Sequence, residues 1–147
     1  MDDVVVAFEP AEEPGLEYAE ALLTDADLPT ADLGSDAVDC YVARAAGERV
    51  GVGALELRGP HALVRSVAVE PDRRGEGYGT AIADALETEA SDAGAERLFL
   101  LTTTARDFFA ARGYEVVDRE AVPDPIRATN EFADLCPASA TVMRKSP

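Results

Sequence analysis

Hydrophobic positions along the chain follow two kinds of pattern, and each kind predicts a different element. Short blocks rich in β-branched and other apolar residues predict strands. Seven such blocks occur, at residues 4–8, 38–45, 50–57, 62–69, 97–103, 114–119 and 140–144. Apolar residues three or four positions apart predict helices over 14–25 and 80–92, with short helices near Phe108 and within 123–135. This order of elements predicts an α+β fold around a mixed sheet.

Length and composition predict one globular domain over residues 1–147. The chain is 47% hydrophobic and 29% charged, which excludes intrinsic disorder. No stretch approaches the roughly 18 uncharged apolar residues that a membrane span needs. The first residues, Met1-Asp2-Asp3, are acidic where a secretion signal is basic, so we expect a cytoplasmic protein. Two Cys and one His predict neither a disulfide framework nor a metal site.

The charge balance is strongly acidic and narrows the choice of partners. Asp and Glu number 29 against 13 Lys and Arg, which gives a net charge of −16, and Lys145 is the only lysine. A negative field of this size excludes nucleic acid and anionic membranes as expected partners. The acidic residues are spread along the whole chain, which indicates adaptation to a high-salt cytoplasm. A moderately acidic protein from an ordinary cytoplasm is the alternative.

Residues 67–80, with the sequence Val-Ala-Val-Glu-Pro-Asp-Arg-Arg-Gly-Glu-Gly-Tyr-Gly-Thr, carry the clearest chemical signal. A strand leads into a loop with glycine at positions 75, 77 and 79, and a helix follows at once. The backbone N–H groups of such a loop converge with those of the helix start, and together they bind a phosphate or pyrophosphate. Arg73 and Arg74 add positive charge to this loop.

Three nucleotide-binding patterns compete for this loop, together with a ligand-free glycine turn. A Walker loop would need Gly-Lys-Ser/Thr after the glycines, and none is present. A dinucleotide fingerprint would need Gly-x-Gly-x-x-Gly after the first strand, whereas three strands precede this loop. The third pattern is Arg-x-x-Gly-x-Gly, formed by Arg74, Gly77 and Gly79. With the preceding Val-Ala-Val-x-Pro and the following helix, it resembles the coenzyme A loop of the GNAT acyltransferase superfamily.

The resemblance covers nearly the full chain and implies a fold and a cofactor. The implied fold is a mixed central sheet of about seven strands, splayed between the fourth and fifth strands and flanked by about four helices. The implied co-substrate is acetyl-CoA, with the splayed strand against its pantetheine arm and the glycine loop around its pyrophosphate. The residues that the resemblance assigns to acetyl-CoA are Val67, Ala68, Val69, Arg74, Gly75, Glu76, Gly77, Tyr78, Gly79 and Thr80.

A closer resemblance lies downstream. Its residues are Leu100-Leu101-Thr102-Thr103-Thr104-Ala105, Phe108-Phe109, Gly113-Tyr114, Val122-Pro123, Ile126-Arg127 and Cys136-Pro137-Ala138-Ser139-Ala140. They resemble GNAT proteins encoded beside arsenical-resistance genes and the acetyltransferase domain of N-acetylglutamate synthases. Both imply an amino acid or an amino-acid-like compound as acceptor.

The chain departs from common GNAT patterns at Phe109, where many members have Tyr, and at Thr102, where Asn is common. Synthase domains also tend to be basic just before the last strand, where this chain has Leu135-Cys136-Pro137.

Candidates for the acceptor side come from polar residues within apolar stretches. Glu56 lies near a strand end, where alternation predicts the face of Val50, Val52 and Ala54, and it could accept a proton from an ammonium group; the alternative is an acid at a fraying strand end. Arg65 interrupts an apolar strand and either binds a substrate carboxylate or forms a structural ion pair. Strand alternation would place it on the face of Val67 and Val69.

Other candidate substrate contacts are Arg127, which could also bind a carboxylate, and Thr103 and Ser139, which could donate hydrogen bonds. The predicted function is N-acetylation of a small-molecule amine by direct attack on the thioester, without an acyl-enzyme. A coenzyme A-binding module without turnover and a protein N-acetyltransferase are the alternatives. A homodimer is one assembly that the resemblance allows.

Overall fold

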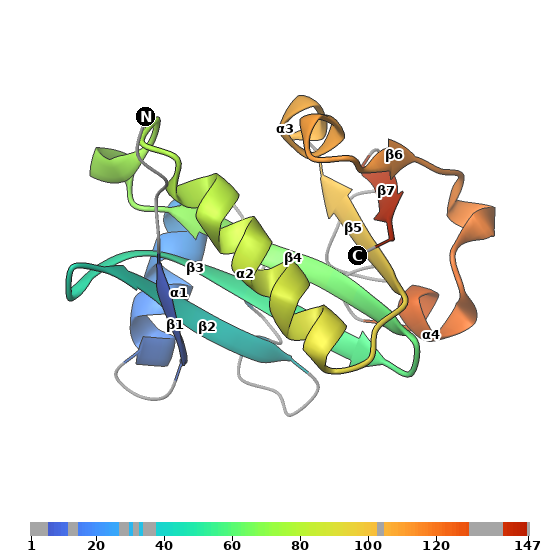
Figure 1. Cartoon of the computed structure of the whole chain (residues 1–147), viewed down its shortest axis with the longest axis horizontal. Helices are drawn as coiled ribbons and strands as arrows, with labels where there is room; N and C mark the ends of the chain where they lie inside the picture. Colours follow the sequence, from blue (N-terminus) through green and yellow to red (C-terminus); the bar gives the residue numbers. More distant parts are fainter. Residues whose placement is uncertain are drawn as a thin grey trace.

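The computed structural model describes residues 6–11, 15–26, 30, 33, 38–102, 105–129 and 140–146. Its strands are β1 (Ala7–Pro10), β2 (Asp39–Ala45), β3 (Glu48–Arg58), β4 (His61–Val69), β5 (Arg97–Thr102), β6 (Glu115–Val116) and β7 (Thr141–Lys145). Its α-helices are α1 (Gly15–Asp25), α2 (Tyr78–Asp92), α3 (Arg106–Ala111) and α4 (Asp124–Arg127), and its 3₁₀ turns are η1 (Pro71–Arg73) and η2 (Arg119–Ala121). The predicted number and order of strands are confirmed, and Figure 1 shows their arrangement.

The strands form one mixed sheet in the order β1-β2-β3-β4-β5-β7-β6. Strands β1 to β4 pair antiparallel with their neighbours in sequence, because short turns join β2 to β3 and β3 to β4. The pair β4–β5 is parallel, and α2 makes the crossover between these two strands. β7 then inserts antiparallel between β5 and β6.

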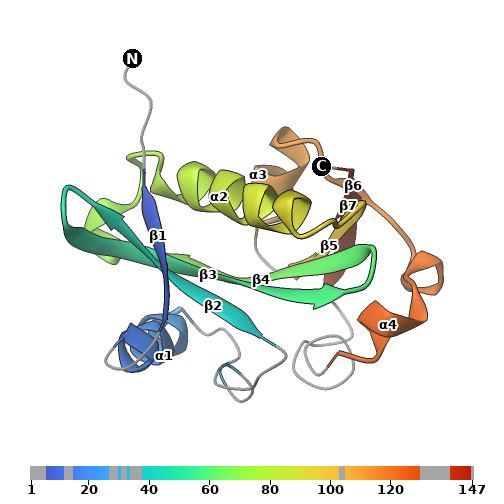
Figure 2. The ribbon, with the colours of Figure 1, turned by 60° about the horizontal axis from the view of Figure 1, so that its bottom comes forward.

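Helices cover both faces of the sheet, and Figure 2 shows α2 on one side with α1 and α4 on the other. On the α2 face, Ile82, Leu86 and Ala90 pack into a core with residues from β3, β4, β5 and β7. On the opposite face, Leu22 and Leu23 of α1 pack over β2 and β3. Ile126 of α4 joins a third cluster that covers β4 and β5 on that same side.

Two glycines of β3 allow α2 to lie close to the sheet. A Cβ atom at Gly53 would lie 2.8 Å from Cδ1 of Leu86, and one at Gly51 would lie 2.7 Å from Cδ1 of Ile82. Because carbon atoms do not approach so closely, a larger residue at either position would force the side chain of Ile82 or Leu86 to shift. The close packing fixes α2 beside the sheet, with its first residue Tyr78 separated from the end of β4 only by the glycine loop. None of the helices in the described residues is long and apolar enough to cross a membrane.

Candidate active site

Strands β4 and β5 separate soon after they begin, and the opening between them defines the candidate site. They pair only through His61 with Arg97, Ala62 with Leu98 and Leu63 with Phe99. Beyond these pairs the two strands diverge, as Figure 1 shows, while β4 stays paired to β3 and β5 to β7. Each strand therefore has one open edge, whose backbone groups are free of the ladder and can bind a ligand. The predicted separation of the fourth and fifth strands is confirmed.

A β-bulge shapes β4 within this opening. Ala54 lies opposite Arg65 and Val52 opposite Ala68, so the single residue Gly53 faces two residues of β4, Ser66 and Val67. Ser66 has a φ of 59°, a left-handed conformation that is uncommon outside glycine. The extra residue reverses the alternation of side chains along the strand.

The bulge overturns one expectation from the sequence. Val67 and Val69 pack against the core on the α2 face. Arg65 instead lies on the opposite face, because its cross-strand neighbour Ala54 packs with α1 there. The prediction that Arg65 shares a face with the two valines is wrong, since strict alternation takes no account of an inserted residue.

The glycine loop has the geometry of an anion site at a helix N-terminus. Gly75 and Gly77 have φ values of 80° and 92°, and no atom lies within 4 Å of a Cβ placed on Gly75. Gly77 is the N-cap of α2; no side chain caps the helix, and its first turn contains no acidic residue. The first N–H groups of α2 thus lack side-chain partners and point toward the loop. These features fit the pyrophosphate of coenzyme A.

The packing around position 79 does not require glycine. Gly79 lies in the first turn of α2, and a Cβ there would meet Phe108 and Val69 at 3.8 Å, which are ordinary contacts. Packing alone would therefore accept alanine at this position. A close approach of ligand to the backbone explains the glycine better.

Contacts from neighbouring elements hold the two ends of the η1 turn that precedes this loop. The Tyr18 hydroxyl of α1 donates a hydrogen bond of 2.7 Å to Glu70, and Arg73 forms an ion pair with Glu48 of β3. Burial, and then the bond to the Glu70 carboxylate, raise the pKa of Tyr18 well above its ordinary value. Arg74 is exposed and makes no ion pair with any residue that the structure describes. Its charge is thus free to meet an anion.

Glu56 and Arg65 form a buried ion pair on the α1 face. Nη1 of Arg65 donates to Oε1 of Glu56 at 2.6 Å, and Nη2 of Arg58 donates to Oε2 at 2.9 Å. The side chains of Arg65 and Glu56 are 0% and 1% exposed.

This ion pair decides between the alternatives left open for both residues. Glu56 is not the free acid expected beside the cleft, because guanidinium groups engage both of its oxygens and its side chain is buried. It is also not an acid at a fraying strand end. For Arg65, the structure shows the structural ion pair.

Helix α3 begins shortly after the end of β5. The backbone N–H of Ala105, the residue before α3, donates to Oγ1 of Thr102 at the end of β5, at 2.9 Å. This bond connects the start of α3 to the end of β5. Phe109 is buried edge-on between Phe108 and Tyr114. Phe108 is half-buried, packs against the core and lies against Gly79, so it also borders the glycine loop.

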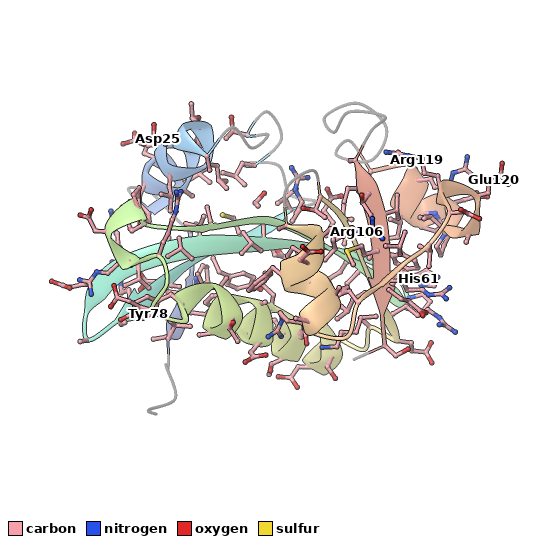
Figure 3. The ribbon with its side chains drawn as sticks, turned by 90° about the horizontal axis from the view of Figure 1, so that it is seen from above. Asp25, His61, Tyr78, Arg106, Arg119 and Glu120 are labelled. Atoms are coloured by element: carbon pink, nitrogen blue, oxygen red, sulfur yellow. The ribbon has the colours of Figure 1, made fainter. Side chains whose placement is uncertain are left out.

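Arg106 is a candidate that sequence reasoning missed. It is the first residue of α3, it is exposed, and it pairs with no acidic residue in the described part of the chain. Figure 3 shows it at the end of α3 away from α2. Six other arginines form ion pairs within the described residues, at Arg44, Arg58, Arg65, Arg73, Arg112 and Arg144. The sequence holds no signal that separates Arg106 from these, because ion pairing depends on contacts between distant segments.

The remaining predicted residues divide into three groups. Arg127 lies exposed on α4, without an ion pair among the residues described. Glu76 and Thr80 are exposed at the glycine loop, and Tyr78 is half-buried there. Thr103 and Ser139 lie outside the described residues. The described residues contain no group of three or more His, Cys, Asp or Glu side chains arranged to hold a metal ion.

Comparison with known proteins agrees with this geometry. The sequence model of the acetyltransferase (GNAT) family matches residues 4–115. This chain belongs to the GNAT family. The GNAT chain is 40% identical over 91 residues to an amino-acid acetyltransferase of Mycobacterium tuberculosis, a match that covers 61% of the chain and 49% of that protein. It thus spans about half the length of that relative.

Two solved structures share the fold. Rv2747 from Mycobacterium tuberculosis, solved in complex with CoA, superimposes with a TM-score of 0.79 at 25% identity over 96% of this chain and 99% of that one. N-acetylglutamate synthase from Neisseria gonorrhoeae, complexed with coenzyme A and L-arginine, gives 0.79 at 19% identity over 98% of this chain and 34% of that one. The GNAT fold expected from the sequence is confirmed.

Proposed function

We propose that this GNAT protein is an acetyl-CoA-dependent N-acetyltransferase that acts on the amine of a small amino acid or an amino-acid-like compound. One observation carries the proposal: the open edge of β4 leads, through the η1 turn and the glycine loop, to a glycine N-cap at the start of α2. Backbone groups for an extended arm and N–H groups for a pyrophosphate are thus consecutive along the chain. The CoA bound to relatives of the same fold, and the amino-acid acetyltransferase similar in sequence, support it.

Each part of the site would perform one task. The free N–H groups of α2 and the guanidinium of Arg74 would hold the pyrophosphate. The open edge of β4 would bind the pantetheine arm, and N–H groups at the bulge would polarise the thioester carbonyl. Acetyl-CoA supplies the acyl group: a neutral amine would attack the thioester carbon, the C–S bond would break as the thiolate leaves, and the nitrogen would pass its extra proton to water or to the thiolate.

The side chain at position 109 limits how the thiolate leaves. The Phe109 side chain has no acidic proton to donate, and its ring is packed between Phe108 and Tyr114. Thiolates are modest bases, so the leaving group would depart unaided or take its proton from water. We therefore assign no general acid to this site.

On the acceptor side, we propose that a free guanidinium binds the carboxylate of the substrate. Arg106 at the start of α3 and Arg127 on α4 are the candidates, because both are exposed and neither pairs with a described acidic residue. Arg65 is the less favoured candidate, since Glu56 already neutralises it. Thr103 and Ser139 remain proposed hydrogen-bond donors to the substrate. The arsenical-resistance resemblance adds amino-acid analogues that contain arsenic to the acceptors worth testing.

The deciding experiment measures coenzyme A thiol release from acetyl-CoA with a panel of amino acids, amino-acid analogues and short peptides, in 0.1 M and in 2 M KCl. Turnover with free amino acids or their analogues supports the proposal. Turnover only with peptides would identify a protein N-acetyltransferase. Tight binding of acetyl-CoA without turnover on any amine would identify a binding module and overturn the proposal.

A further inference from the structure

We propose that Glu56 and Arg65 are positioning residues: their buried ion pair holds the β4 bulge at Ser66 in the conformation that directs backbone groups into the opening between β4 and β5. The inference rests on the proposed function, because the bulge matters for catalysis only if those groups bind a thioester. Its structural part concerns the conformation of Ser66 alone and is testable without an acceptor.

The bulge requires support from its surroundings. Ser66 is not glycine, yet its φ is 59°, a conformation in which a Cβ atom crowds the backbone. Such a residue persists only where neighbouring structure over-determines it. β5 gives no such support, since its pairing with β4 ends at Leu63.

Arg65 is the neighbour placed to give that support. Its Nε lies 3.4 Å from Oγ of Ser66, a long contact, while its Nη1 is 2.6 Å from Oε1 of Glu56. One guanidinium thus connects the bulged residue to β3. Arg58 holds the second oxygen of Glu56, so the carboxylate itself is fixed from two sides.

The register explains why the pair controls the bulge and is not merely near it. Glu56 lies opposite Leu63, and Arg65 lies opposite Ala54, so the ion pair crosses β3 and β4 diagonally just before the inserted residue. On the other side of the bulge, Val67 packs toward α2. Without the ion pair, β4 could return to simple alternation, which would turn Val67 toward the α1 face and reorient its N–H.

The contribution of this ion pair to folding stability does not explain why it is present. Removing two charged groups from water costs as much as their attraction returns, so apolar residues of similar size often stabilise a core equally well. A buried pair that selects one backbone conformation has a purpose that apolar residues do not serve.

The test combines Glu56→Gln, which keeps shape and removes charge, with Ser66→Gly, which adopts a positive φ without crowding. We expect Glu56→Gln to lower kcat at least tenfold while the Kd for coenzyme A changes less than twofold. Adding Ser66→Gly should recover kcat at least fivefold, because glycine no longer needs the support. Arg65→Lys, which keeps the charge but loses Nε, should behave like Glu56→Gln. Glu87→Gln, at another ion pair on α2, is the matched control and should leave kcat unchanged after correction for unfolding.

Backbone resonances provide a readout that needs no turnover. In ¹⁵N,¹³C-labelled protein, Glu56→Gln should shift or broaden the signals of Ser66 and Val67. In the double variant that combines Glu56→Gln with Ser66→Gly, the Val67 signal should appear where it does in Ser66→Gly alone. Unchanged signals would overturn the inference even if the wild type proves inactive. A raised acceptor KM with unchanged kcat and no rescue would show that Arg65 binds substrate. Equal losses in stability, affinity and kcat without rescue would show a purely structural pair.

Discussion

The hydroxyl of Tyr18 on α1 donates a hydrogen bond of 2.7 Å to the carboxylate of Glu70, the residue that joins β4 to the glycine loop. The bond connects α1 to the segment that leads into the glycine loop. α1 covers the sheet face on which Arg65 and Glu56 lie, whereas the loop after Glu70 is the proposed pyrophosphate site. Arg49 stacks on the same tyrosine, with Cζ 4.9 Å from the ring centre.

We predict that Tyr18→Phe weakens coenzyme A binding by about threefold to tenfold, because the loop loses one of its anchors. The free energy of unfolding should fall by about 1.5 kcal/mol, the lower end of the range for one hydrogen bond to a charged group, because the bond is only partly buried. Calorimetric titration with coenzyme A and thermal unfolding measure the two effects. Tyr41→Phe is the control, since Tyr41 stacks on Phe8 and none of its described contacts is a hydrogen bond from its hydroxyl. Equal affinity in both variants would contradict the anchoring role.

Gly77→Val should reduce acetyl-CoA affinity by at least tenfold. Position 77 has a φ of 92°, and a β-branched side chain would both strain this conformation and occupy the proposed pyrophosphate site. Gly94→Val controls for the strain, because Gly94 has a φ of 93° beyond the other end of α2 with nothing within 4 Å of a Cβ. A folded Gly77→Val protein with unchanged affinity would rule out the loop as the coenzyme site.

The acceptor-side proposal predicts that Arg106→Gln or Arg127→Gln raises the KM of the best amino-acid acceptor about tenfold or more. A lost charge-assisted hydrogen bond of about 1.5 to 3 kcal/mol has this size. The KM for acetyl-CoA should stay within twofold. Arg97→Gln is the control, since Arg97 is equally exposed but starts β5 at the closed end of the opening. If all three variants behave alike, the carboxylate is bound elsewhere.

Salt should stabilise this protein. With a net charge of −16, like charges oppose the compact state at low ionic strength, and the screening length falls from about 10 Å at 0.1 M to about 3 Å at 1 M. We expect the unfolding midpoint to rise by about 10 °C or more between 0.1 and 2 M KCl, as a gain of about 3 kcal/mol would produce. The rise of the unfolding midpoint with salt should be smaller in a triple variant that neutralises three exposed acids, Glu17→Gln, Asp92→Asn and Glu96→Gln. A flat or falling midpoint would contradict adaptation to high salt.

Cys40 should resist thiol reagents in the folded protein. Burial raises the pKa of the Cys40 thiol to about 11, so its thiolate fraction near pH 8 is about a hundredfold below that of an ordinary cysteine. In a Cys136→Ser background, labelling by a disulfide reagent should follow global unfolding and accelerate in denaturant. The same shift lowers stability as pH rises from about 9 to 11, because the unfolded chain releases this proton while the folded chain keeps it. Fast labelling at pH 8 without unfolding would contradict this burial.

Much of the fold was predictable because it depends on local sequence. β-branched blocks and helical spacing located the seven strands and the principal helices, since each side-chain pattern matches one backbone period. The glycine loop was also predictable: positive φ angles at Gly75 and Gly77 require the residue type that the sequence shows there. Arg74 followed from the spacing of the same motif.

The polar part of the site depended on the tertiary structure. One inserted residue at Ser66 decides which sheet face Arg65 occupies, and no alternation of apolar and polar residues reveals an insertion. Whether Glu56 is a free acid or one half of a buried pair depends on a guanidinium nine residues away, brought near by strand pairing. The sequence by itself thus determined the elements and the glycine loop, whose conformations are set by adjacent residues. Only the tertiary structure decided which charges are neutralised and which, like Arg106, have no acidic partner among the described residues, because charge pairing depends on distances between segments far apart in the chain.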